Sequence, residues 1–221
     1  MKYWVFDLDG TLIDSFGHYF SLIEEFIGQK ISREEKKHYI GVHPSQIFAD
    51  KLESEKVEIA LKELNHRSQL DAGSISTFNS ISLIFNILSK NGCRIAVWTS
   101  RDLESAKAVL EYTGLKKQVE YLISGDCVSL RKPNPEGLLK IKSLFNCDTH
   151  EMVMVGDHEH DMQAGHKTGV FSIRASWHNH WDDGECIIAN KQFFCDYHFS
   201  EWVCSTFQKI NSQSENLKNG K

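Results

Sequence analysis

The sequence predicts an α/β fold, in which a Rossmann-like, doubly wound parallel sheet carries a small helical domain inserted after its first strand. From residue 78 onward, short apolar runs typical of buried strands alternate with amphipathic segments, as in parallel sheets. Between residues 16 and 77 the apolar residues recur only at helical spacing. We therefore expect residues 1–15 and 78–211 to form an α/β core, residues 16–77 a helical insert, and the polar residues 212–221 a disordered tail.

The individual elements follow from strand-like runs and from helix start and stop signals. Buried strands are expected at residues 3–6, 93–98, 121–124, 152–155 and 170–173, with an edge strand at 197–199. Core helices are expected at residues 79–90, 102–114, 134–141 (with Asn134 as N-cap) and 161–167, before a closing helix near 202–207. Helices of the insert are expected at residues 17–28, 45–52 and 54–70, and a further one opens at the capping box Ser32–Glu35.

Composition argues against several classes of protein. The chain has 221 residues and a formal net charge of −5, so it lacks the surplus of Lys and Arg that a nucleic-acid partner requires. Its apolar runs are too short to span a membrane, and the start of the chain has no signal-peptide pattern. Six cysteines occur singly, without a CxxC pair, as is typical of free thiols in a reducing compartment. We therefore expect a cytoplasmic protein that binds neither nucleic acid nor membranes.

The first predicted strand ends in two carboxylates, within the sequence Asp7-Leu8-Asp9-Gly10-Thr11. Two carboxylates at the end of a buried strand are costly unless a cation or hydrogen-bond donors neutralise them. A simple turn, in which the Asp side chains bind their own backbone, is the alternative interpretation. The groups that follow the later strands decide between the two.

Three later strand ends carry further polar groups: Thr99, Ser100 and Arg101 after the second core strand, Lys132 after the third, and Asp157 and Asp161 after the fourth. The carboxyl ends of parallel strands meet at one rim of the sheet, so we expect these groups to lie close to the first motif. Carboxylates suit a hard divalent cation, and a hydroxyl with a lysine suits a phosphate group. The turn interpretation is therefore disfavoured.

Phosphoryl transfer gives each of these groups a role. A carboxylate nucleophile can approach a negatively charged phosphate only when cations screen the repulsion. We expect Mg²⁺ to be bound by Asp7, the backbone carbonyl of Asp9 and Asp157. Thr99, with nearby backbone amides, and Lys132 would hold the phosphate. Asp7 would form an aspartyl phosphate, with Asp9 as general acid for the leaving alcohol and then as base for the hydrolytic water.

These four motifs resemble those of the haloacid dehalogenase-like (HAD) hydrolase superfamily and occur in the order in which that superfamily carries them. The resemblance spans residues 3 to about 174. The insert between the first and second motifs is similar to a C1-type cap domain, and the layout is most similar to the phosphoglycolate phosphatase-like branch. The resemblance implies the same roles for Asp7, Asp9, Thr99, Lys132 and Asp157, and adds Asp161, which would bind the metal directly or support its ligands.

The sequence therefore predicts a Mg²⁺-dependent phosphatase that hydrolyses a small phosphomonoester, a phosphorylated metabolite, through an aspartyl phosphate on Asp7. Two alternatives stay open. Phosphosugar mutases of the superfamily share the cap position of Gly41–Val42, but they tend to carry an arginine soon after it, where this chain has His43–Gln46. A non-catalytic regulatory or binding member is the other alternative, and the His-rich loops motivate it.

Several polar residues near the motifs carry weaker indications. Ser100 and Arg101 are further candidates for binding phosphate or substrate, although Arg101 could equally form a salt bridge at the start of the next helix. His43, in a loop of the insert, is a candidate for substrate specificity. The histidines within residues 158–160 are expected to decorate their loop, because imidazole is a poorer Mg²⁺ ligand than carboxylate. We expect the His-rich segment Trp177–Trp181 to be a surface loop, and, because it follows the fifth predicted strand, the alternative is that it borders the mouth of the cleft.

Overall fold

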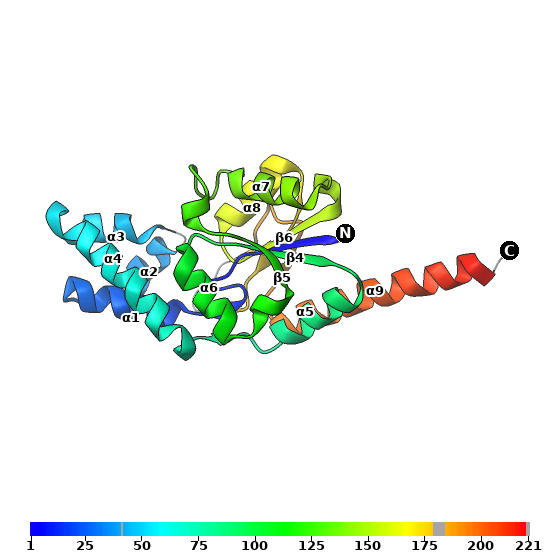
Figure 1. Cartoon of the computed structure of the whole chain (residues 1–221), viewed down its shortest axis with the longest axis horizontal. Helices are drawn as coiled ribbons and strands as arrows, with labels where there is room; N and C mark the ends of the chain where they lie inside the picture. The colour runs from blue at the N-terminus through cyan, green and yellow to red at the C-terminus, as the bar shows by residue number, and fades with distance from the viewer. Residues whose placement is uncertain (41, 179–183, 220–221) are drawn as a thin grey trace.

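The centre of the molecule is a six-stranded sheet with β1 in its interior (Figure 1). The computed structural model describes residues 1–40, 42–178 and 184–219. All neighbouring strands pair in parallel, in the order β5-β4-β1-β6-β7-β8. The strands are β1 (Tyr3–Phe6), β4 (Arg94–Trp98), β5 (Val119–Ile123), β6 (Met152–Gly156), β7 (Phe171–Ala175) and β8 (Lys191–Phe193).

Helices cover both faces of this sheet, which confirms the predicted doubly wound α/β fold. Successive side chains of a strand point to opposite faces. Accordingly, Trp4 and Phe6 of β1 pack in one hydrophobic cluster with α5 (Ile81–Lys90), α6 (Leu103–Tyr112) and the start of α9 (Asp196–Asn219). Tyr3 and Val5 pack in another cluster, with α7 (Glu136–Phe145) and α8 (Glu159–Thr168).

The strand order places a topological switch point between β1 and β6. The chain runs from β1 through β4 to β5 on one side, then returns to β6 and continues through β7 to β8 on the other. Ligands of such sheets bind in the crevice outside the carboxyl ends of the strands at this point. Asp7 follows β1 and Asp157 follows β6, so both residues stand at this crevice.

The insert forms a group of helices at the opposite end of the molecule from the C-terminus (Figure 1). Four helices pack around a hydrophobic cluster of their own: α1 (Phe16–Ile27), α2 (Arg33–Tyr39), α3 (Pro44–Lys51) and α4 (Ser54–Leu70). The buried Glu24 of α1 ties the next segment to this group, because it accepts hydrogen bonds from the Ile31 backbone N–H at 3.1 Å and from Lys30 Nζ at 2.7 Å. The division of the chain into core and cap stays a prediction.

The two ends of the insert are joined by a feature that the sequence did not indicate. The short strand β2 (Ile13–Asp14) pairs antiparallel with β3 (Ser76–Thr77), so residues 76–77 are not part of an all-helical insert. Single 3₁₀ turns occupy residues Asp71–Ser74, Leu115–Gln118, Gly125–Cys127 and Thr149–Glu151. The pairing brings the chain back to the sheet beside the point where it left.

The C-terminal part of the chain differs most from prediction. The predicted edge strand at 197–199 is wrong: the edge strand is β8, and residues 197–199 lie in α9. Phe199 is fully buried and its ring lies 5.3 Å from that of Trp177. Helix α9 also continues to Asn219, through residues expected to be disordered, and extends beyond the sheet (Figure 1). Helix α7 begins at Glu136 with Pro135 at its N-cap, one position later than expected.

Two further predictions concern the whole chain. All six cysteines are free, as expected. None of the helices in the described part of the chain is long and apolar enough to cross a membrane.

Close packing between Gly137 of α7 and Trp98 of β4 yields a stability prediction. A Cβ atom on Gly137 would lie 2.2 Å from Trp98 Nε1, much closer than a relaxed contact. We expect Gly137→Ala to destabilise the fold by about 1–3 kcal/mol, because Trp98 must move. Gly17→Ala is the control: Gly17 lies in helix α1 with open space around it, so stability should stay equal or rise by about 0.5–1 kcal/mol. Urea denaturation measures both, and equal midpoints would contradict the prediction.

Candidate active site

The first motif turns sharply at the switch point between β1 and β6. The Asp7 backbone N–H donates to Val155 O of β6 at 2.8 Å, which fixes the start of the turn. Gly10 has φ +79°, and a Cβ atom there would lie 2.5 Å from Asp157 Oδ2. A side chain at position 10 would therefore be strained and would collide with Asp157. Thr11 Oγ1 donates to Asp157 Oδ1 at 3.2 Å, so the turn also orients this carboxylate.

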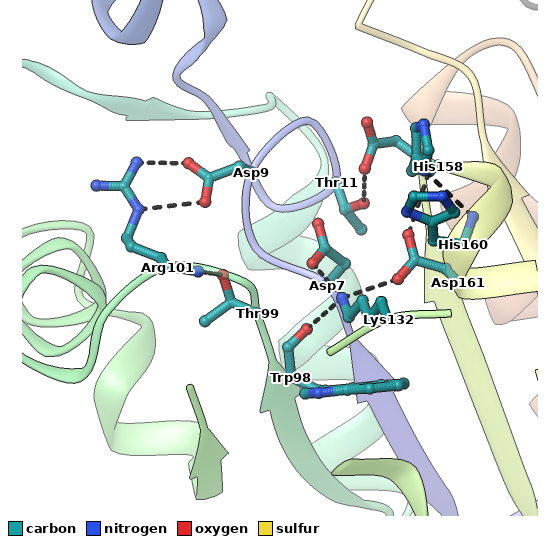
Figure 2. Close-up of polar contacts among 11 residues, drawn as sticks. Asp7, Asp9, Thr11, Trp98, Thr99, Arg101, Lys132, His158, His160 and Asp161 are labelled. Carbon is teal, nitrogen blue, oxygen red and sulfur yellow. Dashed lines mark hydrogen bonds and ion pairs between the residues drawn. The ribbon is translucent and has the colours of Figure 1, made fainter. Parts of the chain in front are cut away.

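Lys132 connects the ends of three strands or their loops (Figure 2). Its Nζ lies 2.5 Å from Asp7 Oδ1 and 2.8 Å from Asp161 Oδ1, and donates to Trp98 O at 2.7 Å. The same ammonium group lies 4.7 Å from the centre of the Trp98 ring. The lysine side chain is only 6% exposed, so these contacts replace its hydration.

Three buried carboxylates, of Asp7, Asp157 and Asp161, form an acidic cluster in which one oxygen of each lies within 4.8 Å of the others. Burial raises the pKa of Asp7 to about 7, although Lys132 opposes this shift and the charge of Asp161 adds to it. Burial also raises the pKa of Asp157 well above its usual range, with the charges of Asp7 and Asp161 adding to the shift. The cluster is made of oxygen donors and is short of positive charge, so it fits a hard divalent cation.

Asp9 lies on another side of the site and faces Arg101 (Figure 2). Arg101 Nε donates to Asp9 Oδ2 at 3.1 Å and Arg101 Nη2 donates to Oδ1 at 2.5 Å, while Ser15 Oγ donates to Oδ1 at 2.5 Å. Burial would raise the pKa of Asp9, but the charge and hydrogen bonds of Arg101 outweigh it and hold this pKa below its usual value. Arg101 thus forms a salt bridge with Asp9 of the first motif, and its contact with substrate stays a prediction.

The loop after β4 presents the predicted phosphate-binding hydroxyls. Thr99 is buried, and its Oγ1 accepts a hydrogen bond from the Arg101 backbone N–H at 3.0 Å. Ser100 lines the site beside it. The backbone carbonyl of Ser100 approaches Gly125 so closely that a Cβ atom there would lie 2.5 Å away. The loops after β4 and β5 are thus packed together at the rim of the sheet.

A cavity of about 210 Å³ lies between this rim and the insert. From the insert, its lining includes Tyr19 of α1 and Leu64 of α4, together with His43. His43 is the N-cap of α3, and its Nδ1 accepts a hydrogen bond from the Ser45 backbone N–H at 3.2 Å. The structure therefore places His43 at the cavity, with one ring nitrogen engaged in capping. Gly41 lies outside the described residues.

The histidines of the fourth motif do more than decorate a loop. His158 is the N-cap of α8, which begins two residues before the predicted start at Asp161. Its Nδ1 accepts from the His160 backbone N–H at 3.2 Å, and the two rings lie 4.3 Å apart. Burial lowers the pKa of His158 to about 4, and the charge of His160 adds to the shift, so a neutral imidazole caps the helix. Both side chains line the cavity.

The segment predicted as a His-rich surface loop begins inside the protein. Trp177 is buried and its Nε1 donates to Thr11 O at 3.1 Å. His178 is also buried, with its ring 5.6 Å from that of Phe16. The surface prediction is therefore wrong for these two residues, which support the first motif and the start of α1. Residues 179–181 of this segment lie outside the described part of the chain.

The structure thus brings together Asp7, Thr99, Lys132, Asp157 and Asp161 at one rim, with Asp9 and Arg101 paired beside them. Tyr19 and the supporting Trp177 were missed by sequence reasoning, because each reaches the site only through the tertiary fold. For His158 and His160, which were placed in the loop of the fourth motif, sequence reasoning missed the capping of α8 by His158.

Comparisons with known proteins agree with this geometry. The family model described as "Haloacid dehalogenase-like hydrolase" matches residues 4–175. The pyrophosphatase PpaX of Bacillus pumilus is 28% identical over 183 residues, covering 78% of this chain and 82% of the relative. The pyrophosphatase PpaX of Listeria welshimeri is 26% identical over 180 residues, with the same coverage.

Solved structures show the same fold. CbbY from Rhodobacter sphaeroides, in complex with phosphate, superposes with a TM-score of 0.79 at 16% identity, covering 87% of this chain and 93% of CbbY. A haloacid dehalogenase-like family hydrolase from Streptococcus pneumoniae gives a TM-score of 0.75 at 17% identity, covering 94% and 98% of the two chains.

The acidic cluster predicts how stability depends on pH. The raised pKa of Asp7 means that the folded state keeps its proton up to about pH 7, whereas the unfolded chain releases it near 3.8. The folded state therefore binds more protons in this window, and its free energy of unfolding should fall as the pH rises from about 4 to 7 in EDTA. Asp7→Asn should flatten this fall. Thermal unfolding measures it, and an Asp7→Asn slope equal to that of the wild type would contradict the prediction.

A divalent cation should reverse the loss of stability. Because the cation binds the ionised carboxylates, Mg²⁺ should raise the unfolding midpoint more at about pH 8 than at about pH 5. The Asp157→Asn variant should show a smaller rise. An equal rise at the two pH values would place the cation elsewhere.

Proposed function

The chain belongs to the haloacid dehalogenase-like hydrolases and is a phosphatase of that family, and we propose that it hydrolyses a small phosphomonoester with Mg²⁺ through an aspartyl phosphate on Asp7. The observation that carries this proposal is the buried cluster of Asp7, Asp157 and Asp161 with Lys132 at its edge. The PpaX relatives support the phosphoglycolate phosphatase-like branch. A cytoplasmic location is part of the proposal.

Different residues of the site would bind the cation and the phosphate. Asp7, Asp157 and the backbone carbonyl of Asp9 would hold the cation, with Asp161 beside them. Bound there, Mg²⁺ would neutralise phosphate charge and favour attack by a carboxylate. Thr99, with Ser100 beside it, would hold the phosphate oxygens. Lys132 would share its positive charge between Asp7 and the phosphate, since its Nζ is already 2.5 Å from Asp7 Oδ1.

The reaction follows in two balanced steps. An Asp7 oxygen attacks phosphorus, the bond from phosphorus to the leaving oxygen breaks, and that oxygen takes a proton from the Asp9 carboxyl group. Asp9, now a carboxylate, takes a proton from water as the water oxygen attacks the aspartyl phosphate. The bond between phosphorus and Asp7 breaks, which releases inorganic phosphate and restores both side chains.

The size of the cavity supports a small substrate. Its volume of about 210 Å³ favours a small phosphorylated metabolite. His43 and Arg101 line the cavity and are candidates for contacts with the leaving group. Pyrophosphate is a second candidate substrate, favoured by the activity named for the PpaX relatives.

The direct test is phosphate release. Purified protein with Mg²⁺ should release phosphate from p-nitrophenyl phosphate, and EDTA should stop the reaction. Asp7→Asn should lower kcat/KM about a thousandfold or more, because it removes the nucleophile. Asp14→Asn is the matched control: Asp14 is an exposed carboxylate on β2, outside the cavity, so its activity should match the wild type.

A substrate panel separates the remaining possibilities. The panel holds phosphoglycolate, phosphorylated sugars, nucleotides and pyrophosphate, each with Mg²⁺. Absence of turnover on every compound would refute the proposal. Interconversion of sugar phosphates without net phosphate release would favour a phosphosugar mutase. Failure to bind beryllofluoride, together with a co-purifying protein partner, would favour a non-catalytic regulatory or binding member.

A further inference from the structure

The carboxylate that would transfer protons is not directed at the nucleophile. Figure 2 shows Asp9 turned towards Arg101 on one side of the site, with Asp7, Lys132 and Asp161 grouped on the other. Each Asp9 oxygen accepts a hydrogen bond from the guanidinium group, and Oδ1 accepts another from Ser15 Oγ. Both oxygens are therefore engaged on the side of the site away from Asp7.

Arg101 is itself held firmly. Its side chain is only 10% exposed, and its backbone N–H donates to Thr99 Oγ1 at 3.0 Å. Two-point pairing of a guanidinium with a carboxylate is both stronger and more directional than a single contact. The Asp9–Arg101 pair thus joins two loops that are 92 residues apart in the chain, and it fixes one orientation of Asp9.

We propose that Arg101 is a positioning residue that withholds the Asp9 carboxylate from proton transfer while the two side chains are paired, so that opening of the Asp9–Arg101 pair is a step of catalysis. This inference rests on the proposed function, in which Asp9 protonates the leaving oxygen. In the paired state both Asp9 oxygens accept hydrogen bonds from the guanidinium group, which holds the carboxylate turned towards Arg101. A substrate whose leaving group needs the proton reacts only in the fraction of molecules in which the pair has opened, and weakening the pair enlarges that fraction.

A purely structural pair would behave differently. If the pair only cross-links the two loops, its loss would loosen the site and slow all substrates by a common factor. A withheld acid affects only substrates whose leaving group needs a proton. The two roles therefore separate when two aryl phosphates that differ in the basicity of the leaving group are compared.

The experiment measures kcat/KM for phenyl phosphate and for p-nitrophenyl phosphate, each with Mg²⁺. The quantity compared is kcat/KM for phenyl phosphate divided by kcat/KM for p-nitrophenyl phosphate. Phenolate is the more basic leaving group and needs the proton from Asp9, whereas p-nitrophenolate leaves readily without it. Because kcat/KM reports the first phosphoryl transfer, the later hydrolysis of the aspartyl phosphate does not enter the ratio. Asp9→Asn should lower the ratio, which establishes that the ratio reports on Asp9.

Arg101→Gln is expected to raise this ratio about three- to tenfold above the wild type, because Gln cannot form the charged two-point pair. Arg101→Lys keeps the positive charge but cannot form the two-point pair, so it should give an intermediate ratio. This variant replaces Arg101→Gln in the test if the Gln variant does not fold. Arg131→Gln is the matched control. Arg131 lines the same cavity, no described carboxylate forms an ion pair with it, and its loss should leave the ratio unchanged.

An unchanged ratio in both Arg101 variants would overturn the inference in favour of a structural pair. A lowered ratio would also overturn it, because Arg101 would then hold Asp9 in its working position. Failure of the proposed function is distinct from either outcome, since the wild type would then hydrolyse neither ester.

Discussion

The contact on which the site depends is the placement of the Lys132 ammonium group between Asp7 and Asp161. A buried lysine loses its hydration, and buried carboxylates lose theirs, so neither charge is stable there without the other. The lysine reaches this position from the loop before α7. Trp98 holds the Lys132 ammonium group in place. The Trp98 carbonyl accepts a hydrogen bond from this group, and the Trp98 ring lies beneath it. Gly137 in turn lets α7 pack against Trp98, so the contact between this helix and β4 helps to fix the position of the Lys132 charge.

Much of this arrangement could be predicted because it follows from one rule of topology. Parallel strands bring their carboxyl ends to one rim, so reading the strands correctly was enough to gather Asp7, Thr99, Lys132 and Asp157. The alternation of apolar segments identified those strands without knowledge of their order. The fold class was accessible for the same reason, since each core strand is a short apolar run bounded by turn residues.

Other features could not be predicted, because they depend on tertiary contacts between segments that are far apart in the sequence. The sequence around Tyr197–Phe199 has the aromatic residues of a strand, but in the fold Phe199 and Val203 lie one turn apart on α9 and enter the core together. Trp177 looked like part of a surface loop because its partner, the Thr11 carbonyl, is 166 residues away. The partner of Arg101 could not be predicted either. An arginine at this position in the sequence is equally compatible with a salt bridge at the helix start and with a contact across the site.

The two aspartates of the first motif show how one short segment can supply two chemically different carboxylates. Both residues follow β1, where the chain turns at Gly10, and their side chains face different surroundings. Asp7 is buried among Asp157 and Asp161, and its pKa is raised; Asp9 is bound by Arg101, and its pKa is lowered. Each is thus held in a protonation state that its neighbours favour. A nucleophile must be ionised and a general acid must carry a proton, so each aspartate has to leave the protonation state that its neighbours favour before the proposed reaction can occur. A cation at the acidic cluster favours the first change, and separation from Arg101 favours the second, so activation of the site requires both charges to be redistributed.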